Sequence, residues 1–415
     1  MNSLLRKTVS MSLLISVLLV ASCTFSTGDF DRQLRSIVQP HAFSLSWWEF
    51  RTLANELKRV FIPDKEASGD DTQIVREYFS LVGQIQALES KIGLARSASN
   101  GDFVSLQKQL EILQQRRTLL EDAAEGILEK QIKEMLIEKG ILHPMDRYIH
   151  LRFVFPPVNF EFEQPPHLLV ISPRDRIELV KRIALSQHLT TDTKERIESE
   201  TDALNMSSLV IELGGFAAVY PTMIIDNIDL HHTIDTVVEE WLHQYLAFRP
   251  LGFLYLLDAS GIRESPEIAT MNESLASIVS KEIGSKVFQR YYYESGESYG
   301  EDTGSETKDS EFDFNREMAE TRRVVEEYLA QGRIEEAEAF MEQRREYFAS
   351  KGYYIRKLNQ AYFAFHQIYA YSPASVSPID TDLEVLRTRS PSLKEFLDKV
   401  AGMTSYRDLE KALGR

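Results

Sequence analysis

The residues of this sequence that are best suited to chemistry lie near its middle, in a predicted helix over Thr233–Leu246. Glu239 and His243 are four positions apart, so a helix places both side chains on one face, about 6 Å apart along its axis. A carboxylate and an imidazole at that spacing can bind one metal ion. Glu240 lies one position round the helix, where its carboxylate could take a proton from a water on that ion.

A purely structural interpretation of the same residues stays open. Thr236 and Glu239 match a capping box, in which the glutamate satisfies a backbone donor at the start of a helix. His243 could be a hydrogen-bonded core residue. His231 and His232 cannot take the place of Glu239 as a metal ligand on this helix. The seven residues from His232 to Glu239 span about 10.5 Å of helix, which is too far. They could serve only if the helix began after them.

A second motif begins at Met271 and reads Met-Asn-Glu-Ser-Leu-Ala, which places Glu273 thirty positions after His243. The two motifs resemble the H-E-x-x-H and N-E-x-x-A of gluzincin zinc metallopeptidases, with Glu239 at the position of the first histidine. The Arg-Pro-Leu-Gly that follows at Arg249 resembles a group of bacterial lipoprotein aminopeptidases. The specific resemblance covers about sixty residues, from 230 to 290.

The resemblance implies a fold and a set of roles. The fold class is α+β and mostly helical, with a gluzincin-like core, a small β-sheet, active-site helices and an inserted long helical hairpin. Glu239, His243 and Glu273 are the implied metal ligands, and Glu240 is the implied general base. The implied cofactor is zinc, and the implied substrate is a peptide or protein.

Further roles follow from the same resemblance. Tyr362 or Tyr369 would stabilise the oxyanion; the alternative for each is a packing tyrosine. A strand at Gly214–Tyr220 would pair with an extended substrate, or it could be an ordinary core strand.

Glutamate at position 239 changes the charge of the ligand set. Two neutral histidines and one carboxylate leave a zinc site at +1, whereas two carboxylates and one histidine bring it to zero. The ion then becomes a weaker Lewis acid. Oxygen ligands also favour harder ions, so Mn²⁺ or another divalent ion is the alternative cofactor.

The start of the chain predicts export and lipid attachment. Arg6 and Lys7 precede fifteen uncharged residues, and Val20-Ala21-Ser22 then leads into Cys23, the only cysteine of 415 residues. This pattern resembles a lipoprotein signal, with Cys23 as the lipid attachment site. An ordinary signal peptide or an uncleaved anchor is the alternative. We expect a bacterial cell-envelope protein anchored to the membrane on its extracytoplasmic face. With a formal net charge of −16, we expect no nucleic-acid partner.

Composition and periodicity divide the chain into six segments. We expect a lipoprotein signal peptide (1–22), an N-terminal linker and packing segment with an aromatic knot (23–70), a helical hairpin of unknown partner (71–140), a metallopeptidase-like core (141–293), an acidic disordered loop (294–313) and a C-terminal helical subdomain (314–415). Within the core, strands are expected at 152–155, 168–171, 208–211 and 214–220, with a helix at 174–188. Helices are also expected at 315–350 and 354–371.

Two functions remain open at this point. The first is a membrane-anchored extracytoplasmic metallopeptidase that hydrolyses peptide bonds with the help of a metal ion. The second is a catalytically inactive peptidase-fold lipoprotein that acts as a binding or scaffold protein. They differ in whether the site with Glu239 holds a metal ion and hydrolyses peptides.

Overall fold

A computed structural model describes most of the chain: residues 29–43, 71–98, 103–144, 153–217, 219–226, 229–259, 265–293, 312–365 and 378–415. Four expectations lie outside these ranges, namely the signal peptide with Cys23, the aromatic knot before residue 71, the acidic loop up to residue 311, and Tyr369. No helix within the ranges is both long and apolar enough to cross a bilayer.

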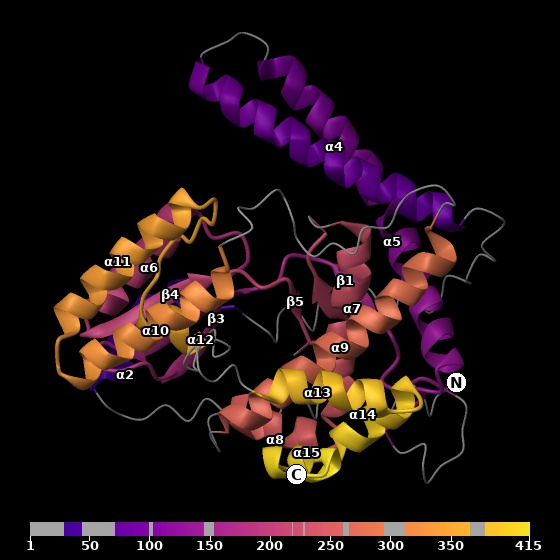
Figure 1. The fold of residues 1–415 in the computed structure, drawn as a ribbon. Helices are drawn as coiled ribbons and strands as arrows, with labels where there is room; N and C mark the ends of the chain where they lie inside the picture. Colours follow the sequence, from indigo (N-terminus) through magenta and orange to yellow (C-terminus); the bar gives the residue numbers. More distant parts are fainter. Residues whose placement is uncertain are drawn as a thin grey trace.

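The fold is α+β, mostly helical, with two small sheets of three strands each (Figure 1). In the first sheet, β6 (Thr222–Ile224) lies between β1 (Phe160–Phe162), which runs parallel to it, and β5 (Gly215–Phe216), which runs antiparallel. The second sheet is antiparallel, with β2 at its centre. Its strands are β3 (Lys181–Leu185), β2 (His167–Pro173) and β4 (Met206–Ile211).

The second sheet overturns two local predictions. Residues 181–185, expected within a helix, form β3. Ile183 and Leu185 alternate onto one face and pack there with Leu169 and Ile171 of β2. Pairing with β2 therefore outweighs the weak helical periodicity of this segment. The apolar run at 153–155 is likewise not a strand, because β1 begins only at Phe160.

Helices cover both faces of this sheet. One face packs on α2 (Asp29–Val38), which leads into η1 (Gln39–His41), and on α6 (Thr191–Asp202). The other face packs on α12 (Gln360–Phe365). The expected helix at 315–350 is two helices, α10 (Phe314–Ala330) and α11 (Ile334–Ser350). Gly332 breaks it by adopting a φ of +72°, which an L side chain rarely tolerates.

The largest hydrophobic core lies beside the first sheet and contains Leu128, Ile132, Leu242 and Leu275. Three helices in the middle of the chain contribute to it: α7 (Leu230–Leu246), α8 (Pro250–Ala259) and α9 (Pro266–Tyr291). The last three helices do so as well: α13 (Pro378–Arg389), α14 (Leu393–Ala401) and α15 (Tyr406–Leu413). Residues 314–415 are therefore shared between two hydrophobic cores, because α10 and α11 have a cluster of their own.

The segment 71–140 forms two long helices, α4 (Asp71–Ala98) and α5 (Phe103–Glu138), that pack on each other. One end of this pair projects beyond the rest of the molecule (Figure 1). The other end contributes buried side chains such as Val75 and Leu128 to the large core. The base of the pair is therefore an integral part of the body.

Polar contacts also attach the base of this pair to the turn before α7. The Tyr78 hydroxyl donates to Asp226 Oδ2 at 2.9 Å, and Arg117 Nη1 lies 3.0 Å from the same carboxylate. Glu121 lies on the other side of Arg117, at 4.0 Å. Burial raises the pKa of Glu121 to about 7; Arg117 opposes this shift and Asp226 adds to it. Arg117 thus forms ion pairs with two carboxylates, Asp226 and Glu121, that are largely removed from water.

We expect Glu121→Gln to stabilise the protein above neutral pH. A carboxyl whose pKa is raised by folding favours the folded state only while protonated, so its ionisation destabilises the fold as pH rises from about 4.5 to 7. Urea unfolding should therefore show the variant more stable than wild type by about 1–2 kcal/mol at pH 8, with no difference at pH 4. Glu77→Gln, in the exposed Arg116–Glu77 pair, is the control, with a change below about 1 kcal/mol. Parallel pH profiles for wild type and Glu121→Gln would contradict this account.

Candidate metal centre

Helix α7 carries the first motif in its interior. The helix is capped by Asp229, whose side chain accepts from the His232 backbone N–H at 2.8 Å, and it continues to Leu246. Thr236 and Glu239 thus lie two turns inside the helix, where the Thr236 hydroxyl donates to the His232 carbonyl. The capping-box interpretation of Glu239 is wrong. His231 and His232 are in the same continuous helix, so they cannot fold back to replace a ligand.

Helices α7 and α9 pack side by side, and small residues of α9 permit the close approach. At Gly284 an added Cβ would lie 3.0 Å from Cγ and 3.3 Å from Cα of Asp235. Because a larger residue there would force the helices apart, this glycine helps to fix their spacing. The packing places Glu273, near the start of α9, opposite the last turns of α7.

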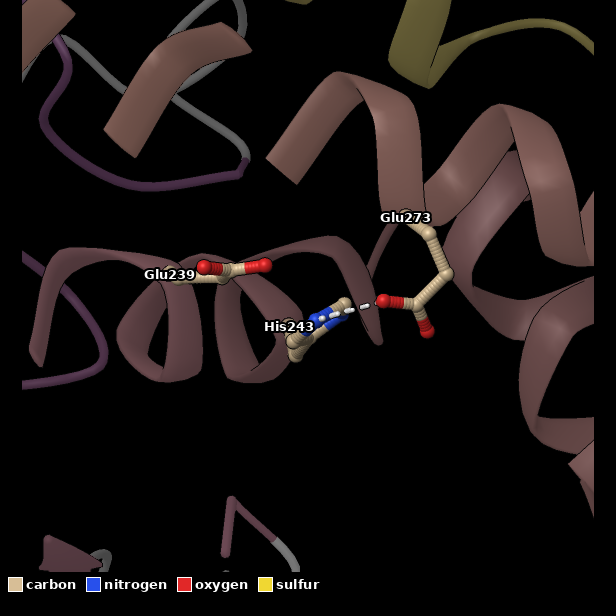
Figure 2. Close-up of side chains that lie close together, drawn as sticks. All are labelled: Glu239, His243 and Glu273. Atoms are coloured by element: carbon tan, nitrogen blue, oxygen red, sulfur yellow. Dashed lines mark ion pairs between the residues drawn. The ribbon is translucent and has the colours of Figure 1, made fainter. Parts of the chain in front are cut away.

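Glu239, His243 and Glu273 converge as the spacing of the motifs predicts (Figure 2). Each offers one ligand atom, and the three atoms all lie within 4.8 Å of one another. His243 Nε2 is 3.6 Å from Glu273 Oε2. Ligand atoms around a tetrahedral ion with bonds of about 2 Å are about 3.3 Å apart. Small side-chain rotations would therefore bring the three atoms to metal-binding distance.

A hydrogen bond to Asn272 orients the imidazole ring of His243. The Asn272 amide lies 2.9 Å from His243 Nδ1, and Asn272 Oδ1 is buried without a hydrogen-bond partner among the described residues. Turning the amide by 180° would let Oδ1 accept from Nδ1–H. The Nε2 lone pair would then face the two carboxylates, as a metal-ligating histidine requires. The residues present thus fit a divalent cation.

Glu240 follows Glu239 on α7 and its side chain lies against β5. The Ala217 backbone N–H donates to its carboxylate, and the chain passes so close that a Cβ on Gly215 would lie 2.6 Å from Glu240 Cγ and 2.7 Å from Cδ. One turn later, Gln244 Nε2 donates to the Ala217 and Val219 carbonyls, both at 3.1 Å. Helix α7 therefore holds the β5–β6 connection against Glu240.

The site concentrates negative charge. Burial raises the pKa of Glu240 to about 7; His243 lowers it, and repulsion from Glu239 and Glu273 adds to the rise. Burial also raises the pKa of Glu239, again against the attraction of His243. Three carboxylates around one histidine repel one another in a partly desolvated space. A divalent cation would relieve that repulsion.

The structure does not bring every predicted site residue here. Tyr362 lies on α12, where its ring contacts Phe363 at 5.7 Å and it joins the clusters beside the second sheet. Tyr255 of α8, which the sequence did not single out, is in the site instead: its hydroxyl donates to Glu273 Oε1 at 2.6 Å. Tyr255 lies within the apolar run of α8, so its pattern indicates only core packing.

Comparisons with family models, curated proteins and solved structures give no match to this chain. The geometry of the site defines a candidate metal centre with one nitrogen and two oxygen donors, and a fourth acidic group, Glu240, beside it.

Gly215→Ala should disturb the site, because the new methyl group has to displace the Glu240 carboxylate or shift β5. We expect a loss of about 1–3 kcal/mol in the free energy of unfolding, measured with urea. Gly214→Ala is the matched control, since no atom of the described residues lies within 4 Å of a Cβ at that position. Its change should stay within about 1 kcal/mol in either direction. Equal losses in the two variants would show that Gly215 is not needed for this approach.

Proposed function

We propose that this protein is a membrane-anchored extracytoplasmic metallopeptidase with a gluzincin-like core. The observation that carries the proposal is the convergence of Glu239, His243 and Glu273, two of them from one motif and the third from another thirty positions away. The resemblance of both motifs to those of gluzincins supports the same assignment. The sequence that leads into Cys23 resembles a lipoprotein signal, and this resemblance supports an extracytoplasmic location.

The three ligands would hold a divalent cation, which polarises a carbonyl group and makes water more acidic. Glu240 lies at the edge of this triad and acts as general base. It takes a proton from water as the oxygen adds to the substrate carbonyl carbon. It then gives the proton to the amine nitrogen as the C–N bond breaks. The hydrogen bond from the Ala217 backbone N–H and the close approach of Gly215 orient the Glu240 carboxylate for this role.

The peptide substrate would lie along β5. Among the described strands, β5 lies at the edge of its sheet and pairs with β6, and Glu240 lies against it. An extended peptide can add to such an edge through main-chain hydrogen bonds. The reacting carbonyl would then lie next to Glu240 and the metal ligands.

Zinc is the proposed cofactor, with Mn²⁺ as the alternative because two of the three donors are carboxylates. Glutamate at position 239, where gluzincins have histidine, also favours a second candidate function. With two carboxylates and one histidine, the site including the divalent ion has zero net charge, so the ion is a weaker Lewis acid. This suits a peptidase-fold lipoprotein that binds a partner without catalysis.

Elemental analysis and a peptide-library assay test the proposal together. Purified wild-type protein should contain about one equivalent of zinc or manganese and hydrolyse peptides. Glu240→Gln should keep the metal, because residue 240 is not a ligand, and lose about 100-fold or more of the activity. Glu282→Gln on α9, where Glu282 pairs with Arg387 and Lys286, is the control and should retain both.

The outcomes separate the two candidate functions. If the protein binds metal but hydrolyses no peptide with any divalent ion, the binding protein is favoured. Glu239→His should then raise the affinity for metal. A wild-type protein free of metal, with a Glu240→Gln variant that behaves identically, would overturn the metallopeptidase.

A further inference from the structure

Tyr255 contacts two of the three candidate ligands at once. Its hydroxyl donates to Glu273 Oε1 at 2.6 Å. Its ring stacks on the imidazole of His243, with ring centroids 5.8 Å apart and an interplanar angle of 21°. The ligands come from α7 and α9 and Tyr255 comes from α8, so a third helix contributes to the centre.

The position of α8 is fixed by contacts that do not involve the site. At Gly252 an added Cβ would lie 2.7 Å from Leu246 Cβ and would collide with the Leu246 carbonyl, so α8 touches the end of α7 at this point. Arg249, at the junction, donates to the Pro144 carbonyl at 2.7 Å and pairs with Asp398 at 3.1 Å. Tyr255 follows Gly252 by three residues, so it lies on the same face of α8, toward α7.

Glu273 needs such support because its side chain is 51% exposed, whereas that of His243 is only 16% exposed. An exposed glutamate samples several rotamers, and ordering it costs conformational entropy. The hydrogen bond from Tyr255 occupies Oε1, and Oε2 is the oxygen that faces His243 Nε2 at 3.6 Å. The carboxylate thus presents a single oxygen to the triad.

We propose that Tyr255 is a positioning residue that holds Glu273 as a one-oxygen ligand and aligns His243 beside it. Three protein atoms then bind the ion, and its remaining positions stay open to water and substrate, as a catalytic site requires. Without the hydroxyl, Glu273 is free to bind through both oxygens or to turn into solvent. This inference rests on the proposed metal centre.

The test is a titration of metal-free protein with Co²⁺, followed by visible absorption, which reports the number and geometry of ligands. Tyr255→Phe keeps the stacked ring and removes only the hydroxyl. We expect Co²⁺ to bind about 10-fold to 100-fold more weakly than to wild type and the absorption bands to change in position and intensity. Tyr255→Leu, which also removes the stacking, should bind Co²⁺ more weakly still.

Tyr291→Phe is the matched control, because the Tyr291 hydroxyl donates to Glu134 at 2.8 Å far along α9 from the site. It should bind Co²⁺ as wild type does, with the same spectrum. If Tyr255→Phe also matches wild type in affinity and spectrum, the role of Tyr255 is overturned while the metal centre stands. If wild type itself binds no Co²⁺, the metal centre fails and this inference fails with it.

Discussion

The packing of α7 against α9 is the constraint on which the rest of the site depends. Leu242 and Leu275, both fully buried, belong to the core that holds the two helices together, and Gly284 lets them approach. Each helix has a fixed rotation once its apolar face is buried. The backbone positions of the polar residues at the edge of that interface are therefore fixed, and Cα of Glu273 lies where its side chain can reach His243.

That packing also creates an electrostatic problem, because it gathers three carboxylates where water is partly excluded. Each of these carboxylates has a different partner in the surrounding structure. Glu240 accepts from the Ala217 backbone, Glu273 from the Tyr255 hydroxyl, and Glu239 has the attraction of His243. These contacts orient the carboxylates but do not cancel their charge. A bound cation is the group that would complete the site.

The elements that the sequence predicted well are those whose pattern is local. Apolar residues spaced by three and four predicted the long helices α4 and α5, and the four-residue spacing of Glu239 and His243 predicted that they share a face. Residues 181–185 form a strand rather than the expected helix because they pair with β2, and their own residue pattern does not reveal that pairing. The capping box failed for a related reason: Thr236 and Glu239 have the right spacing, but the helix begins at Asp229 instead.

The sequence by itself determined the donor set of the candidate centre, since residue types and helical spacing suffice to name Glu239, His243, Glu273 and Glu240. Only the tertiary structure decided which groups surround them. Tyr255 belongs to the site because Gly252 lets α8 approach α7, and Tyr362 packs elsewhere because α12 covers the second sheet. Such contacts join residues that no periodicity relates, so they are fixed by packing in three dimensions rather than by any pattern along the chain.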